Sequence, residues 1–380
     1  MRSEWREVKL KDVCAIKYGK DHRLLEEGSI PVYGSGGVMR YVNDYLYDKT
    51  SVLIPRKGTL DNLFIVKEPF WTIDTLFWTK IDEEIIDPWF LYFSLLIRNL
   101  AGKNVGTAVP SLTIKVLNEV NLLIPPLPTQ KAIAATLSCL DARIEVNNKI
   151  IKNLEQQAQA LFKSWFVDFE PFQDEEFVES ELGLIPKGWE IKPLNEIARY
   201  INGLAMQRYR PQKNESSLPV VKIKELRQHF ADIDSDRCSE NIDSDFIIDN
   251  GDVVFSWSGS LLVDIWVGGK AGLNQHLFKV TSKSYSKWFY YYWTKFHLKQ
   301  FQNIAQSRAT TMGHIRRGHL KEAKVLVPHK TQLYKMSLVM DTILNFKITL
   351  RVENTTLAAL RDTLLPKLMS GEIEVPVEQG

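Results

Sequence analysis

Apolar residues recur with a helical period in two long stretches of the chain. From Ile133 onward they alternate four and three positions apart, the heptad spacing of a coiled-coil seam, with Asn147 at the one polar position. A second, less regular seam follows in the C-terminal part, interrupted by the polar residues Lys347, Asn354 and Arg361. These patterns predict two long helices, over 129–170 and 330–371.

Such a helix needs a partner. Over 130–166 it would be about 55 Å long at roughly 1.5 Å per residue, and its apolar stripe must be buried along that length. The other long helix is the expected partner. A seam asparagine lowers stability but fixes register, so Asn147 and Asn354 either set the register or are solvated defects in a tolerant helix. The residues predicted to pair the helices are Leu140, Ile144, Asn147, Ile151, Leu154, Ile343, Leu350, Asn354 and Leu357.

The segments before the two helices resemble each other. Short β-branched and aromatic runs between Gly, Asn and Asp turns predict a small mixed α/β globule at 1–128 and another at 189–329, with a linker at 171–188 and a tail at 372–380. Trp5 and Trp189 open matching segments that reach Gly19 and Gly203 at the same offset. The expected fold is therefore α/β, with two similar globules separated by two long helices that pair as an antiparallel coiled coil. Further matches are Ser29-Ile-Pro-Val with Ser217-Leu-Pro-Val, Trp89-Phe-Leu-Tyr with Trp288-Phe-Tyr-Tyr, and Thr129-Gln130 with Thr331-Gln332.

Composition narrows the class of protein. With 380 residues, 44% hydrophobic and 25% charged, the chain has the material for two or three globular domains. Its first residues lack the apolar core of a signal peptide, and the longest apolar run, Trp89–Ile97, is too short to cross a bilayer, so we expect a cytoplasmic protein without a membrane partner. The net charge is only +2, but basic residues outnumber acidic ones over 199–227 while 232–252 is acidic. One surface can therefore be positive although the chain is balanced.

Sequence motifs of catalysis are missing. The chain has no P-loop, no HExxH, no nucleophile elbow and no nuclease carboxylate-lysine pattern, its seven histidines are scattered, and its three cysteines form no CxxC pair. We expect neither enzymatic activity nor a cofactor or metal. The missing motifs disfavour a self-sufficient methyltransferase or nuclease, whereas a coiled-coil adaptor that binds only proteins stays open.

Three segments resemble a known family. They are Leu161-Phe-Lys-Ser-Trp-Phe-Val-Asp-Phe-Glu-Pro-Phe, Leu184-Ile-Pro-Lys-Gly-Trp-Glu and Leu364-Leu-Pro-Lys-Leu-Met-Ser-Gly-Glu-Ile, and they closely resemble the central and C-terminal regions of type I restriction-modification specificity subunits. The resemblance covers essentially the whole chain. It implies that each globule is a target-recognition domain for one half of a split site in double-stranded DNA. It also implies that the paired helices dock two methyltransferase (M) subunits, and that ATP-dependent restriction (R) subunits join the complex.

Candidate DNA contacts are residues of the types used for phosphates and base edges. The first globule offers a glycine-rich segment from Tyr33 to Arg40 and a basic turn at Arg56. The second offers a segment from Gln207 to Arg210 and an amide-rich cluster at Asn274, which suits purine edges. The full set is Tyr33, Ser35, Gly36, Gly37, Arg40, Arg56, Lys57, Thr59, Thr107, Gln207, Arg208, Tyr209, Arg210, Ser258, Asn274, Gln275, His276 and Arg308.

Each candidate also fits a plainer interpretation. The glycine-rich segment equally suits a hairpin without a ligand, and the arginines of the second globule equally suit a solvated face. A methyltransferase cofactor loop is rejected for the glycine-rich segment, because no Asp/Asn-Pro-Pro-Tyr/Phe motif follows it. The differences between the loops of the two globules predict a target that is asymmetric as well as split.

Overall fold

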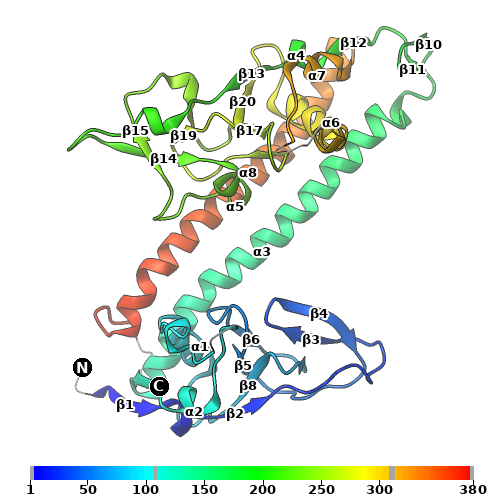
Figure 1. Ribbon diagram of the computed structural model, residues 1–380. Coiled ribbons are helices and arrows are strands. Elements are labelled where there is room, and N and C mark those ends of the chain that lie inside the picture. Colours follow the sequence, from blue (N-terminus) through cyan, green and yellow to red (C-terminus); the bar gives the residue numbers. More distant parts are fainter. Residues whose placement is uncertain (1–3, 107–108, 308–312, 377–380) are drawn as a thin grey trace. The chain divides into compact units, whose positions relative to one another are not determined.

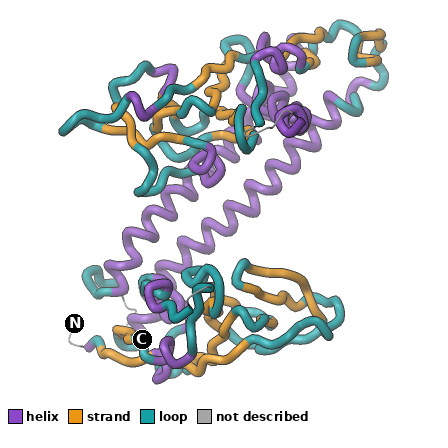
Figure 2. The backbone as a smooth tube through the Cα atoms, in the orientation of Figure 1, coloured by secondary structure: helices purple, strands orange, loops and turns teal. Residues whose placement is uncertain are grey.

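The computed structural model describes residues 4–106, 109–307 and 313–376, which form two compact units. Unit 1 comprises Met1–Arg143 and Leu357–Gly380, and unit 2 comprises Ile144–Thr356. Two helices of 40 residues each, α3 (Leu127–Phe166) and α8 (Lys330–Met369), contribute one part to each unit (Figure 1). Outside these helices, strands and loops predominate in both units (Figure 2).

Unit 1 is built on two small sheets and a strand pair. The larger sheet is antiparallel, in the order β2-β8-β5-β6, and the smaller one joins β3 antiparallel to β4 and parallel to β7. Helix α1 begins with Pro88 after Asp87, whose carboxylate caps the backbone N–H groups of Trp89 and Phe90. The elements are β1 (Arg6–Lys9), β2 (Cys14–Tyr18), β3 (Ile30–Gly34), β4 (Gly37–Val42), β5 (Ser51–Pro55), β6 (Phe64–Val66), β7 (Trp71–Thr72), β8 (Leu76–Ile81), α1 (Pro88–Leu96), α2 (Ile114–Asn118) and β9 (Asn121–Ile124), which pairs with β1.

Unit 2 repeats this topology. Its sheet β13-β20-β17-β18 corresponds to β2-β8-β5-β6, its parallel pair β14 and β19 corresponds to β3 and β7, and its pair β12 and β21 corresponds to β1 and β9. The predicted fold class is therefore confirmed. The elements are β10 (Phe177–Ser180), β11 (Gly183–Pro186), β12 (Glu190–Pro193), α4 (Leu194–Ile197), β13 (Arg199–Asn202), β14 (Ser217–Val221), α5 (Ile223–Gln228), β15 (Arg237–Ser239), β16 (Ile247–Ile248), β17 (Val253–Ser256), β18 (Leu262–Ile265), β19 (Ala271–Leu273), β20 (Leu277–Thr281), α6 (Lys287–Ser307), α7 (Arg317–Glu322) and β21 (Lys324–Val327).

The two repeated glycines allow one strand end to approach another backbone. A Cβ on Gly19 would lie 2.0 Å from the carbonyl oxygen of Ile73, and a Cβ on Gly203 would lie 2.3 Å from that of Asn274. No other residue fits at either position. The shared offset of the glycines thus reflects the same packing in both units.

The polar positions of the predicted seams are paired between the two long helices. In unit 2, Asn147 Nδ2 donates to Asn354 Oδ1 over 2.9 Å, and Lys347 Nζ lies 2.5 Å from Glu155 Oε2. In unit 1, Arg361 Nη1 lies 2.7 Å from Asp141 Oδ1. As α3 advances from Asn147 to Glu155 within unit 2, the partner on α8 moves back from Asn354 to Lys347, so the helices run antiparallel there.

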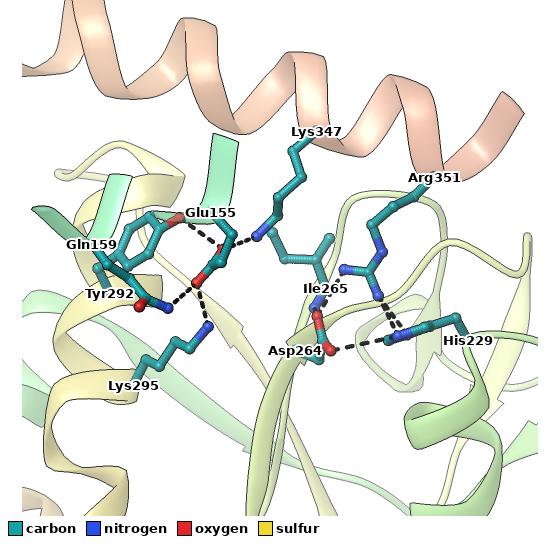
Figure 3. A network of polar contacts seen from close by, with 9 residues as sticks. All are labelled: Glu155, Gln159, His229, Asp264, Ile265, Tyr292, Lys295, Lys347 and Arg351. Carbon is teal, nitrogen blue, oxygen red and sulfur yellow. Dashed lines mark hydrogen bonds and ion pairs between the residues drawn. The ribbon is translucent and has the colours of Figure 1, made fainter. Parts of the chain in front are cut away.

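A polar network fastens the second globule to this helix pair within unit 2. Glu155 also accepts hydrogen bonds from Lys295 and Tyr292 of α6 and from Gln159 (Figure 3). Next to it, Arg351 of α8 bonds to Asp264 of β18 and to the ring of His229, which ends α5 (Figure 3). Aromatic residues of α6, all buried from Trp288 to Trp293, fill the space between the helices and the sheet.

Candidate nucleic-acid interface

Unit 2 gathers most of its predicted contact residues around one hollow of about 990 Å³. The hollow lies between the end of β13, the end of β14 and the loops that follow β17 and β19. Sequence-predicted residues that line it are Gln207, Arg210, Ser258, Asn274, Gln275 and His276, and further basic residues at its edge are Lys222, Lys224 and Arg237. Residues as far apart in sequence as Gln207 and His276 therefore line one hollow, whose surface is both polar and apolar.

The turn Asn274–His276 presents its side chains to this hollow. Asn274 is itself buried. Its backbone N–H donates to the carbonyl oxygen of Val221 (3.2 Å), and its side-chain Oδ1 accepts the backbone N–H of His276 (3.2 Å). Nδ1 of His276 lies 2.9 Å from Ser258 Oγ, which orients the ring. Gln275 Nε2 lies 3.5 Å from His276 Nε2, while the buried Oε1 has no hydrogen-bond partner within the described part of the chain. The amide oxygen of Gln275 is thus a buried acceptor whose hydrogen-bonding capacity is not satisfied by the described residues.

The basic and acidic segments of unit 2 lie against each other. Lys222 and Lys224 form ion pairs with Asp236 (2.6 Å) and Asp232 (2.7 Å). The hydrogen bond from Lys224 holds the pKa of Asp232 at about 2, well below its ordinary value. The acidic segment therefore neutralises part of the basic rim, and the exposed side chains of Arg208 and Arg210 remain available to phosphates.

Unit 1 brings its own two candidate loops together. Ser35 and Gly36 form a two-residue hairpin turn between β3 and β4, in which Gly34 pairs with Gly37 (φ 111°). The side chain of Asn62 donates to the carbonyl oxygen of Ser35 over 2.7 Å, which joins this turn to the loop after Arg56. Arg40 points elsewhere and donates to the carbonyl oxygen of Leu25 (2.8 Å).

Arg56 of unit 1 contacts both Tyr18 and Asp74. Its guanidinium lies 5.3 Å from the ring centre of Tyr18 and donates to the backbone oxygen of Asp74 over 3.1 Å. Lys57 and Thr59 follow Arg56 and are exposed. The backbone of Lys57 forms an isolated antiparallel β-bridge with that of Ser111. Tyr33 is half-buried against Phe64, so only part of its side chain reaches the surface. The candidates Thr107 and Arg308 lie outside the described residues.

The two surfaces are equivalent parts of the repeat. Arg56 N donates to Thr75 O (2.8 Å) as Trp257 N donates to His276 O (3.3 Å), and Gly19 N donates to Leu76 O (3.2 Å) as Gly203 N donates to Leu277 O (2.9 Å). The turn over 73–75 therefore corresponds to the turn over 274–276. Asp74 is a residue that the sequence analysis missed, although extending the repeat through this turn would have aligned it with Gln275.

Within residues 4–106, 109–307 and 313–376, no group of three or more His, Cys, Asp or Glu side chains is arranged to hold a metal ion. None of the helices in those ranges is both long and apolar enough to span a membrane.

Comparison with known proteins defines the class to which this architecture belongs. The family described as type I restriction modification DNA specificity domain matches residues 2–156 and 186–357, so each match includes one globule and part of the helix that follows it. The chain belongs to this family. The resemblance inferred from its sequence motifs is therefore confirmed, and with it the expectation of a non-catalytic subunit.

Individual relatives cover most of the chain. It is 28% identical over 347 residues to the type I restriction enzyme MjaIX specificity subunit of Methanocaldococcus jannaschii. This match covers 87% of the present chain and 79% of the relative. The chain is also 24% identical over 389 residues to the type I restriction enzyme HindI specificity subunit of Haemophilus influenzae, and that match covers 83% of the chain and 82% of the relative. The crystal structure of a type I restriction-modification S subunit from M. genitalium shares the fold, with a TM-score of 0.66, 17% identity and 96% coverage of both chains.

Proposed function

We propose that this chain selects the DNA target of a type I restriction-modification complex. The recognition domain at 1–128 contacts one half of a split site in double-stranded DNA, and the domain at 189–329 contacts the other half. The helices at 129–170 and 330–371 act as the spacer between the two domains and dock two methyltransferase subunits. ATP-dependent restriction subunits then join this complex. Such a complex acts on DNA in the cytoplasm.

One observation carries this proposal: both units have the same backbone framework, but different side chains at the same loops. The position of Arg56 in unit 1 is taken by Trp257 in unit 2, and that of Asp74 by Gln275. A shared framework places the loops on DNA in the same way, whereas different side chains contact different bases. This combination supports a target whose two halves differ.

The helix pair supports the role of a spacer. A bipartite site is recognised only when its halves are separated by the distance that the protein sets. The pairs Asn147–Asn354, Glu155–Lys347 and Asp141–Arg361 favour one register of α3 against α8. A fixed register in turn supports a fixed number of base pairs between the two half-sites.

Genome-wide methylation mapping tests the proposal. Cells expressing the chain with its cognate methyltransferase should show a split, asymmetric motif that disappears when only this chain is removed. A methylome that does not change on removal would contradict the proposal and would favour a coiled-coil adaptor without direct DNA contact.

A further inference from the structure

The equivalent turns of the two units carry different hydrogen-bonding groups at the same place. In unit 1 the carboxylate of Asp74 stands beside the guanidinium of Arg56. At the equivalent positions of unit 2 the turn carries the amide of Gln275, and the strand end carries the indole of Trp257, whose backbone N–H donates to His276 O. The repeated backbone hydrogen bonds of the two turns fix this correspondence. A difference in what the two surfaces bind can therefore arise from these four side chains without any difference in fold.

The unit 1 pair combines an acceptor with a donor. Arg56 Nη1 lies 3.7 Å from Asp74 Oδ2, and the two side chains are 31% and 66% exposed. Their separation exceeds a normal hydrogen bond, so both keep hydrogen-bonding capacity for a ligand. In the major groove, a G·C pair presents the acceptors O6 and N7 on guanine and the amino donor N4 on cytosine. Arginine matches the guanine edge, and a carboxylate matches the cytosine amino group.

The unit 2 pair combines an amide with an apolar ring. Gln275 carries the acceptor Oε1, which is buried and has no hydrogen-bond partner among the described residues, and the donor Nε2. When the partly exposed side chain turns outward, these two groups match N6 and N7 of adenine. The N–H of Trp257 is already donated to Asn202 Oδ1 over 2.9 Å, and its ring packs against His276 and Phe278, so only the exposed part of this half-buried ring remains for contacts. The thymine of an A·T pair has a methyl group in the major groove that suits such an apolar contact.

We propose that residues 56 and 74 of the first recognition domain and residues 257 and 275 of the second are equivalent specificity positions. The first pair selects a G·C base pair in its half-site, and the second selects an A·T base pair in the other. This inference rests on the proposed function, which supplies the DNA and the two half-sites.

Near-isosteric substitutions test each position with little risk to the fold. Asp74→Asn replaces an acceptor-only group by an amide, and Gln275→Glu replaces an amide by an acceptor-only group. Methylation mapping of complexes carrying each variant should show one relaxed base pair. The relaxed pair is a G·C pair in one half-site for Asp74→Asn and an A·T pair in the other half-site for Gln275→Glu. Discrimination there should fall on the order of tenfold, the range measured for one well-placed base contact.

An exchange variant provides the sharper test. Trp257→Arg combined with Gln275→Asp gives unit 2 the side chains of unit 1, and should change the selected A·T pair to G·C without affecting the other half-site. Exposed residues of the same types away from the turns provide matched controls, and Asp48→Asn and Gln156→Glu should leave the motif unchanged. If the exchange variant fails to fold, the two single variants decide the question alone.

The outcomes separate the two proposals. A wild-type motif that stays intact and unrelaxed in Asp74→Asn and Gln275→Glu would overturn the inference while leaving the proposed function in place. A wild-type methylome that does not depend on the chain at all would instead remove the proposed function on which the inference rests.

Discussion

Single residues decide whether the equivalent turns can form. Gly203 brings β13 against the carbonyl oxygens of Leu273 and Asn274, and Gly19 does the same beside Thr72 and Ile73. A hydrogen atom is the only side chain that fits between these backbones. The glycines thereby fix the position of the neighbouring turns, which carry the proposed specificity residues.

Replacing Gly203 by alanine should destabilise unit 2. The added Cβ would lie 2.3 Å from two carbonyl oxygens, so the backbone would have to move, at a free-energy cost of about 3 kcal/mol. Thermal denaturation of the full chain measures the effect. Gly318→Ala is the matched control: a Cβ there meets nothing within 4 Å on helix α7, and should raise stability by about 0.5 to 1 kcal/mol. Equal midpoints for the two variants would contradict the packing argument.

At the scale of elements, the helix pair is held by buried polar contacts as well as by its apolar seam. Lys347 has a side chain only 4% exposed, and its charge is compensated by Glu155, which is 20% exposed. Burial raises the pKa of the Glu155 carboxyl, but the attraction of Lys347 and Lys295 outweighs it and lowers the pKa to about 2. The carboxylate is thus charged in the folded protein at every pH above that value.

Replacing Glu155 by glutamine should cost roughly 3 kcal/mol at pH 7, because Lys347 then stays buried without a counter-charge. Denaturation by urea measures this difference in the free energy of unfolding. Glu145→Gln is the control on the same helix, since its exposed pair with Lys149 should contribute less than about 1 kcal/mol.

The same pair predicts how the destabilisation depends on pH. A carboxyl with a depressed folded-state pKa stabilises the protein fully above its ordinary value of 4.5, and this contribution is lost as the pH falls toward 2. The difference between wild type and Glu155→Gln should therefore be constant above pH 5 and shrink below it. A difference independent of pH down to 2.5 would show that the carboxylate charge is not what stabilises the pair.

The asparagine layer should matter for register more than for stability. Asn147 is fully buried, with its Nδ2 bonded to Asn354, so replacing both by leucine should keep or raise the denaturation midpoint. Without the polar layer, other registers become accessible. Methylation mapping should then show more than one spacer length, while Asn153→Ala on the exposed face of α3 should keep a single one. A single unchanged spacer in the double variant would place the register elsewhere, in the charged pairs.

At the scale of the whole molecule, charge limits what the chain can do alone. A net charge of +2, together with the ion pairs of Lys222 and Lys224, gives the chain little excess positive charge to offer phosphates, so the isolated chain should bind DNA weakly. Partner subunits would have to supply further contacts.

Charge reversal at Arg208 or Arg210 should weaken DNA binding by the assembled complex about tenfold, and lower the salt dependence of the binding constant by roughly one phosphate contact. Titration of a labelled duplex at several salt concentrations measures both. Lys299→Glu, which reverses an exposed charge on α6, is the control. Unchanged affinity in both arginine variants would exclude this loop from the DNA contact.

The sequence by itself determined the features that depend on local periodicity. Heptad spacing predicted both long helices, because an apolar stripe of that length needs a facing helix. The internal repeat predicted two similar globules, because equal patterns of strands and turns fold in the same way. The motifs around Leu161 and Leu364 were sufficient to suggest the family that the comparisons then confirmed.

Only the tertiary structure decided which distant side chains meet. It paired Asn147 with Asn354 and Glu155 with Lys347, gave Arg40 a backbone partner, and set the acidic segment against Lys222 and Lys224. It also aligned Asp74 with Gln275. Such contacts depend on the register of helices and the path of loops, which many side chains fix together, whereas a sequence pattern reports only the neighbours along one element.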